Sequence, residues 1–219
     1  MRDLVIFGTG GSAREVCQAI EDVNAAGPTW RIVGFLDGDA SRHGSELRDL
    51  PVLGGAGWAA EHPDTTVVVA IGGPAGRRAV VGELADLGVT GPERFPVVVH
   101  PTAWIGNHVR VGEGSVVLAG AAVSTDIDLG PFAALNKNCI VGHDAVLEPF
   151  VTIAPGASVS GHVRLGEGVN LGANSVVVQG RSVGAGTVVG AGAVVAEDLP
   201  ARVTAVGVPA RVIRRHDDV

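Results

Sequence analysis

His143 and Asp144 are adjacent residues whose chemical types suit proton transfer. A neutral imidazole titrates near neutral pH and can accept a proton from an amine or an alcohol that acts as a nucleophile. A neighbouring carboxylate can hold the ring in one tautomer and raise its basicity. The alternative is an exposed histidine without a chemical role. The choice between them depends on what positions the pair.

The surrounding sequence is a ladder with a period of six residues. Seventeen consecutive positions, each six residues after the last, hold Val, Ile or Leu without an insertion. An α-helix cannot keep such a period on one face, because it repeats every 3.6 residues. Hexapeptide repeats instead indicate a parallel β-helix. The positions are Val99, Ile105, Val111, Val117, Val123, Leu129, Leu135, Val141, Leu147, Ile153, Val159, Leu165, Leu171, Val177, Val183, Val189 and Val195.

The ladder places His143 and Asp144 at a corner of this β-helix. Three hexads make one triangular coil of 18 residues, and successive coils lie about 4.8 Å apart, the usual spacing of strands. The pair follows the inward-facing Val141 by two and three positions, so both residues should face solvent or a neighbouring subunit. His162 stacks on Asp144 in the next coil, from where it could support His143.

A metal site is not expected. A catalytic zinc ion takes about three histidine or carboxylate ligands. The histidines of the repeat region fall on different faces and coils, and no second histidine lies within a few residues of His143. These histidines are His100, His108, His143 and His162.

Residues 1–96 predict a small Rossmann-like α/β domain, and residues 97–219 a β-helix domain with a C-terminal tail. Apolar runs at 4–7, 31–36 and 67–71 are typical of buried parallel strands. They alternate with two predicted helices, of which the second spans 76–87 with Val80, Val81, Leu84 and Leu87 inward. Residues 50–55 predict a short edge strand and a turn.

A glycine-rich turn follows the first strand and predicts a phosphate site. Gly8-x-Gly10-x-x-Ala13 approximates a dinucleotide fingerprint, in which the helix N-terminus offers free N–H groups to a phosphate. Asp37 ends the second strand, where such folds contact a ribose. The turn could equally serve packing alone. If it binds, any nucleoside diphosphate fits, and an NAD-dependent oxidoreductase is disfavoured because the repeat offers no hydride-acceptor site.

Composition excludes several classes of protein. The formal net charge of −7 argues against binding driven by nucleic-acid phosphates. No apolar run is long enough for a transmembrane helix, and the start reads as a strand rather than a signal peptide. The two cysteines suggest no disulfide framework, which fits a reducing cytoplasm.

Several segments together resemble the hexapeptide-repeat sugar O- and N-acetyltransferases. These enzymes are typified by the sialic acid O-acetyltransferases and the UDP-amino-sugar N-acetyltransferase of bacillosamine synthesis. The resemblance runs nearly from end to end and combines the α/β domain with an uninterrupted β-helix, which it implies is left-handed. Its segments are LVIFGTGGSAREV, VGFLDGD, LPVLGG, VAIGG, VVHPTAWIG, NCIVGHDAVLEPFVTIAPGASVSGHV and AVGVPARVIR.

The resemblance implies a cytoplasmic homotrimer of polysaccharide biosynthesis that transfers acetyl directly from acetyl-CoA to a nucleotide-linked amino sugar. Acetyl-CoA would lie between neighbouring β-helices, and the N-terminal domain would hold the sugar nucleotide. His143 matches the general base, and Asp144 matches its acidic neighbour. Substrate positions match Gly10, Gly11, Ser12, Asp37, Gly38 and Gly72. Acetyl-CoA positions match Thr152, Gly161, Ala173 and Ala191.

The chain departs from the family pattern at two of these positions. Many members have a histidine where this chain has Ser12, a position that the resemblance assigns to the nucleotide contact. Many also have a histidine where this chain has Thr152, a position that it assigns to a hydrogen bond with the acetyl-CoA thioester. Two alternatives therefore stay open beside N-acetylation. One is O-acetylation of a sialic acid or another sugar, and the other is a trimeric protein that binds nucleotide sugars without catalysis.

Overall fold

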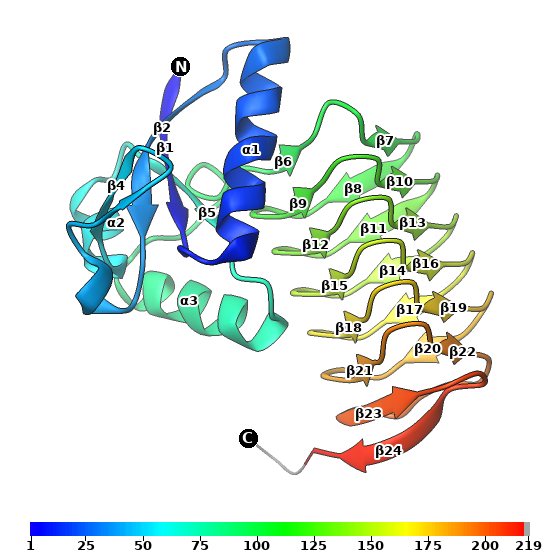
Figure 1. Cartoon of the computed structure of the whole chain (residues 1–219). Coiled ribbons are helices and arrows are strands. Elements are labelled where there is room, and N and C mark those ends of the chain that lie inside the picture. Colours follow the sequence, from blue (N-terminus) through cyan, green and yellow to red (C-terminus); the bar gives the residue numbers. More distant parts are fainter. Residues whose placement is uncertain (217–219) are drawn as a thin grey trace. The chain divides into compact units, whose positions relative to one another are not determined.

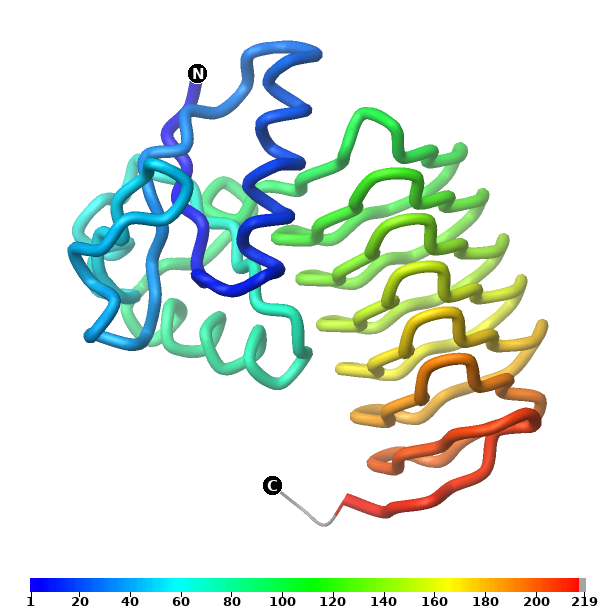
Figure 2. Tube along the Cα trace, viewed as in Figure 1, coloured from blue at the N-terminus to red at the C-terminus, as the bar shows by residue number. Residues whose placement is uncertain are grey.

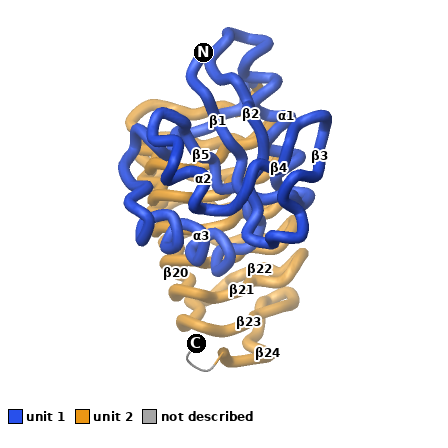
Figure 3. The backbone as a smooth tube through the Cα atoms, turned by 90° about the vertical axis from the view of Figure 1, so that its left-hand side faces the viewer, with its two compact units in different colours: residues 1–101 blue, residues 102–219 orange. Residues whose placement is uncertain are grey.

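The computed structural model describes residues 1–216 and divides into two compact units. Unit 1 spans Met1–Pro101, and unit 2 begins at Thr102 (Figure 3). Unit 1 is an α/β domain and unit 2 a left-handed parallel β-helix, as the sequence predicts. The last three residues of the predicted C-terminal tail lie outside the described part.

Unit 1 is built on one small, largely parallel sheet. Its strand order is β3-β4-β2-β1-β5, in which only β3 runs antiparallel to its neighbour. The apolar runs of β1 and β5 and the end of the run in β2 are buried, because helices follow these strands in the chain and cover the sheet. The strands of the unit are β1 (Arg2–Phe7), β2 (Trp30–Leu36), β3 (Glu46–Leu47), β4 (Leu50–Gly54), β5 (Thr66–Val69) and β6 (Val98–Val99).

The helices of unit 1 are α1 (Gly11–Ala26), the short 3-10 helix η1 (Ala40–Arg42), α2 (Ala56–Glu61) and α3 (Pro74–Asp86). Helix α1 buries an apolar stripe that includes Val16, Cys17 and Ile20. Gly10 caps its start and Gly27 its end, while Pro74 begins α3, where a missing N–H costs nothing.

Two details of unit 1 differ from the expectation. Leu87 is 47% exposed rather than inward, because α3 ends at Asp86 and the chain turns away before the next helical contact. The strand at 50–54 is not at the edge of the sheet. It lies between β2 and β3, because residues 46–47 add a further strand that has no clear alternation in the sequence.

Unit 2 consists of stacked coils, each of which adds one short strand to each of three parallel sheets (Figures 1 and 2). The first sheet holds β7 (Trp104–Ile105), β10 (Ala122–Val123), β13 (Ile140–Val141), β16 (Ser158–Val159), β19 (Val176–Val177) and β22 (Val194–Val195). The second holds β8 (Val109–Val111), β11 (Ile127–Leu129), β14 (Val146–Leu147), β17 (Arg164–Leu165) and β20 (Ser182–Val183). The third runs from β9 (Val116–Val117) through β12 (Ala134–Leu135), β15 (Thr152–Ile153), β18 (Asn170–Leu171) and β21 (Val188–Val189) to β23 (Val203–Val206). The chain then turns back, and β24 (Arg211–Arg215) pairs antiparallel with β23.

The register of the sheets is 18 residues, as the ladder predicts. Val123, Val141 and Val159 occupy successive places in one column. The ladder residues from Val117 to Val195 are buried, and they form the core of the β-helix. Ile105 and Val111 are only half-buried, because they belong to the first coil of unit 2.

Glycine follows many ladder residues because the next coil passes too close for a side chain. At Gly142, a Cβ atom would lie 2.6 Å from the backbone nitrogen of Gly161, far inside van der Waals contact. Glycine is therefore required immediately before His143. Among the described residues, no helix is both long enough and apolar enough to cross a membrane.

We expect Leu165→Ala to destabilise unit 2 by about 2–5 kcal/mol, because the side chain is fully buried and its removal leaves a cavity. Chemical denaturation followed by circular dichroism measures this loss. The matched control is Arg164→Ala, the outward-facing neighbour in the same strand, which should cost less than about 1 kcal/mol. If the two variants lose the same free energy of unfolding, the prediction that Leu165 faces the core and Arg164 faces outward is wrong.

Candidate active site

His143 lies at the corner between β13 and β14, beside Asp144. The two side chains are 47% and 48% exposed, so both reach solvent from a rigid backbone. Asp144 adopts a left-handed backbone conformation with φ of 58°, which turns the chain into the next strand. Aspartate tolerates this region better than most residues.

A hydrogen bond joins the two side chains. His143 Nδ1 lies 2.7 Å from Asp144 Oδ2. An ionised carboxylate can only accept, so Nδ1 carries the proton, and in the neutral ring Nε2 keeps its lone pair. The hydrogen bond from His143 holds the pKa of Asp144 below its ordinary value, and the nearby His162 acts in the same direction. The carboxylate therefore stays charged when it orients the ring.

The next coil supplies Gly161 and His162, which contact this pair. A Cβ atom at Gly161 would lie 2.6 Å from His143 Nε2, so the absence of a side chain makes room for the ring. The His162 ring stands edge-on to that of His143 with centroids 5.0 Å apart, and its Nε2 lies 3.7 Å from Asp144 Oδ2. His162 thus lies where it can support His143.

The expectation that the histidines of the repeat are spread over different faces and coils is wrong for these two. His143 and His162 belong to different coils, but neighbouring coils stack directly, and the corner brings both rings to Asp144. The sequence separation of 19 residues is one coil plus one residue. The stacking of columns already places His162 beside Asp144, but the expectation of no metal site considers only histidines within a few residues of His143.

The four predicted acetyl-CoA positions do not gather around His143 within one chain. Gly161 touches the His143 ring, but Thr152 is buried on β15 in another sheet. Ala173 and Ala191 stack at the corner that follows β18 and β21, on the other side of the sheet that contains β13.

In unit 1, the predicted substrate residues lie at the carboxyl ends of parallel strands. Gly10, Gly11 and Ser12 begin α1 after β1, Asp37 and Gly38 follow β2, and Gly72 follows β5. Ser12 and Gly72 are close, because a Cβ atom at Gly72 would lie 2.8 Å from Ser12 Oγ. Crevices at the carboxyl ends of such sheets commonly bind ligands, and here the sheet order reverses at β1.

Two further residues at this end of the sheet carry no signal of their own in the sequence. Thr9 Oγ1 donates a hydrogen bond to Asp37 Oδ2, and Arg42 Nη1 donates to Thr9 Oγ1 over 2.6 Å. Asp37 Oδ1 also accepts from the Asp39 backbone N–H. Arg42 brings a positive charge to the glycine turn, which suits a diphosphate. It lies in η1, a segment without a recognisable motif.

Arg77 is a third residue that the sequence does not single out. It is buried in α3, where its Nη1 donates hydrogen bonds to the carbonyl oxygens of Ile71 and Gly72 over 2.9 and 3.1 Å. Burial lowers the pKa of its guanidinium to about 10. The Arg77 side chain thus holds the backbone of the Gly72 turn in place through these two hydrogen bonds.

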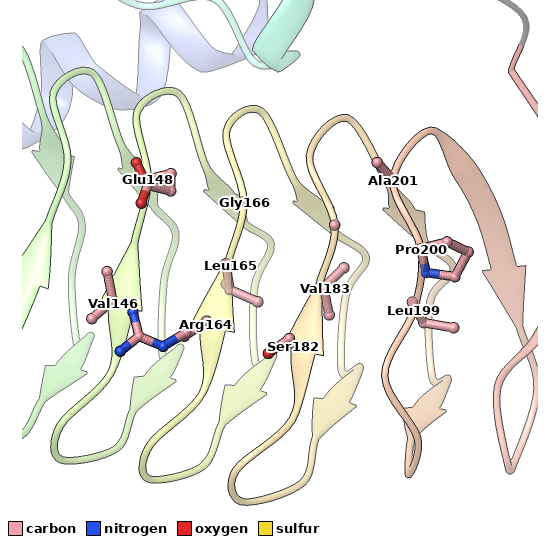
Figure 4. Close-up of a pocket in the computed structure, with 11 residues that line it drawn as sticks. Val146, Glu148, Arg164, Leu165, Gly166, Ser182, Val183, Leu199, Pro200 and Ala201 are labelled. Carbon is pink, nitrogen blue, oxygen red and sulfur yellow. The ribbon is translucent and has the colours of Figure 1, made fainter.

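Unit 2 also has an open groove on its second sheet. The groove has a volume of about 310 Å³, and Glu148, Arg164 and Ser182 are its polar residues (Figure 4). Its apolar part includes Leu165, Val183 and Pro200. None of the predicted site residues lines it.

Comparisons with known proteins identify the family. The PglD N-terminal domain model matches residues 3–84. PerB from Caulobacter crescentus, solved with CoA and GDP-perosamine, is 33% identical with a TM-score of 0.83, and the match covers 97% of each chain. The chain belongs to the hexapeptide-repeat sugar acetyltransferase family. The acetyltransferase domain of PglB from Neisseria gonorrhoeae, solved with acetyl coenzyme A, is 31% identical with a TM-score of 0.85. This match covers 97% of this chain and 99% of that one.

Curated relatives of this chain match over a shorter stretch. The GDP-perosamine N-acetyltransferase of Escherichia coli O157:H7 is 33% identical over 126 residues, which are 55% of this chain and 57% of the relative. Serine acetyltransferase 1 of Arabidopsis thaliana is 35% identical over 135 residues, which are 58% of this chain and 38% of the relative. The chain thus spans about half the length, or less, of these curated relatives.

We expect Gly161→Ala to move the His143 ring, because the new methyl group cannot share the space of Nε2. A crystal structure should show the ring rotated away and the Nδ1 hydrogen bond to Asp144 lengthened. The control is Gln179→Ala, which truncates an exposed residue one coil further along the same column. If the His143 ring does not move in Gly161→Ala, the prediction that a methyl group at position 161 collides with the ring is wrong.

Proposed function

We propose that this protein transfers an acetyl group from acetyl-CoA to the amino group of a nucleotide-linked amino sugar. The observation that carries the proposal is the His143–Asp144 pair. Asp144 accepts the Nδ1 proton, which leaves Nε2 with a lone pair at an exposed corner of a sugar acetyltransferase fold. That is the arrangement of a general base oriented by a carboxylate.

The proposed reaction needs one proton acceptor and no covalent enzyme intermediate. The neutral sugar amine attacks the thioester carbonyl, so a C–N bond forms and the C–S bond breaks. His143 Nε2 takes the proton that the amine loses. The CoA thiolate leaves with the electron pair of the C–S bond and receives the proton that His143 took, which gives free CoA and returns the ring to its neutral form. Asp144 stabilises the imidazolium in the interval.

Unit 1 holds the nucleotide in this proposal. The start of α1 presents backbone N–H groups to the diphosphate, and Arg42 adds a positive charge beside it. Asp37 accepts a hydrogen bond from a ribose hydroxyl. The two relatives that act on or bind GDP-perosamine make a GDP-linked amino sugar the first substrate to test.

The acetyl-CoA site, by the same proposal, lies between copies of the chain in a homotrimer. Thr152, Ala173 and Ala191 are remote from His143 within one chain, and a cleft between copies lets different faces contribute. The first sheet carries an outward column of mainly apolar side chains beside the His143 corner. Its members are Trp104, Ala122, Ile140, Ser158, Val176 and Val194.

The apolar column supports an interface between copies. Trp104 and Ile140 are 60% and 50% exposed, although both side chains are large and apolar. The outward column of the second sheet is mainly polar instead, with Val146 as its apolar member and with Arg110 and Asp128 paired over 2.6 Å. A protein of this proposed activity works where acetyl-CoA and nucleotide sugars are found, so we place it in the cytoplasm, in polysaccharide biosynthesis.

We expect His143→Ala to lower kcat/KM for N-acetylation by about 10²–10⁴, the usual contribution of a general base. The assay follows CoA release with GDP-, UDP- and dTDP-linked amino sugars, and with a sialic acid as an O-acetyl acceptor. The control is His108→Ala, a histidine at the equivalent corner two coils earlier, with expected full activity.

Each other outcome of this assay excludes part of the proposal. An unchanged rate in His143→Ala would show that His143 is not the general base. Transfer to the sialic acid alone would replace N-acetylation by O-acetylation. A nucleotide sugar that raises Tm, with no effect of acetyl-CoA and no transfer, would indicate a binding protein without catalysis.

We expect Ile140→Glu to dissociate the trimer, because a buried carboxylate without a partner is strongly unfavourable at an apolar interface. Light scattering coupled to size exclusion measures the mass. Ser182→Glu places the same charge outward on the second sheet and should leave the trimer intact. A monomeric wild-type protein, or an Ile140→Glu trimer, would contradict this interface.

A further inference from the structure

We propose that His143, Asp144 and His162 form a binding site for Zn²⁺, and that the ion inhibits the protein when it binds there. One nitrogen of each ring and one oxygen of Asp144 lie within 4.8 Å of one another. The set of two imidazoles and one carboxylate is a frequent zinc ligand set, and it leaves a fourth position for water.

The distances fit a small rearrangement around one ion. Zinc–nitrogen and zinc–oxygen bonds of about 2.0–2.2 Å in a tetrahedron separate the ligand atoms by about 3.3 Å. Here Asp144 Oδ2 lies 2.7 Å from His143 Nδ1 and 3.7 Å from His162 Nε2. The two values lie on either side of the required separation, so modest rotations of exposed side chains suffice.

The backbone holds the three ligands in place before an ion arrives. The His162 N–H donates to the His143 carbonyl over 2.8 Å, and the Asp144 N–H donates to the Thr125 carbonyl over 3.2 Å. Asp144 and His162 share the same left-handed backbone conformation, with φ of 58° and 57°, and therefore project from equivalent places in successive coils. Little backbone entropy is lost when the ion binds.

The ligand chemistry selects the type of metal. Imidazole suits zinc and its neighbours Cu²⁺ and Ni²⁺, whereas Mg²⁺ and Ca²⁺ prefer oxygen ligands. The cysteines do not compete for zinc. Both are buried, and burial raises the pKa of Cys17 to about 11 and of Cys139 to about 12, so neither offers a thiolate near neutral pH.

The effect on catalysis rests on the proposed function, whereas binding itself does not. Coordination through Nδ1 replaces the hydrogen bond that orients His143, and coordination through Nε2 occupies the lone pair that accepts the proton. Either mode removes the general base. Zinc is therefore an inhibitory ion here and not a cofactor of the transfer.

Zinc binding is tested on the full-length, metal-free protein with a chromophoric indicator and without CoA, whose thiol binds zinc. We expect one Zn²⁺ per chain in the wild type and no displacement by Mg²⁺. His162→Asn should weaken binding by ~100-fold, since even the loss of an outer partner of a ligand costs 10–100-fold. The matched control His108→Asn removes a corner histidine outside the cluster that His143, Asp144 and His162 form among the described residues, and it should bind as the wild type does.

A zinc titration of the wild-type protein followed by NMR provides a second measurement, in case the variant does not fold. The ring signals of His143 and His162 should shift together and those of His108 should not. Binding that is equally tight in His162→Asn, a shift confined to other histidines, or no binding would overturn the proposal. Transfer assays with added Zn²⁺ test the inhibition, which a chelator should reverse. If the protein shows no transfer activity, the binding measurements still show whether His143, Asp144 and His162 bind zinc.

Discussion

Hydrogen bonds between successive coils fix the geometry on which the candidate site depends. Each coil of unit 2 donates backbone N–H groups to the coil that follows, as Gly142 does to Val159 over 2.7 Å. The buried aliphatic ladder prevents a shift of one residue, which would turn every core side chain outward. A corner residue therefore has a position set by the whole stack, and His143 can be oriented by one carboxylate although it is half exposed.

The same stacking explains why small residues surround the chemistry. Gly142 lets the chain reach the corner, and Gly161 leaves space for the His143 ring, so neither glycine contributes a functional group and both are needed for geometry. In unit 1 the turns around Gly10 and Gly72 are held in a comparable way, with Arg77 bound to the carbonyl oxygens of Ile71 and Gly72. Each unit thus combines a rigid scaffold with exposed groups that are available to ligands.

A coil of 18 residues brings together residues that are remote along the chain. His162 lies one coil further along and approaches Asp144. The pair of His143 and Asp144 thereby becomes a cluster of three residues that can each bind a metal ion. In the proposed transfer His143 Nε2 accepts a proton, and a zinc ion bound to either ring nitrogen would prevent this. Base catalysis and zinc binding are therefore mutually exclusive at this corner, and free zinc would govern which of them occurs.

The sequence by itself determined the β-helix, its register and the α/β unit, because a six-residue period and alternating apolar runs leave few other folds. It also placed His143 and Asp144 at a corner, since every residue in a strict repeat has a fixed direction. Only the tertiary structure decided how the His162 ring lies against the pair, that Arg42 bonds to Thr9 and Thr9 to Asp37, and that Leu87 is exposed. These outcomes depend on side-chain rotamers and on where a helix ends, which no repeat or motif encodes.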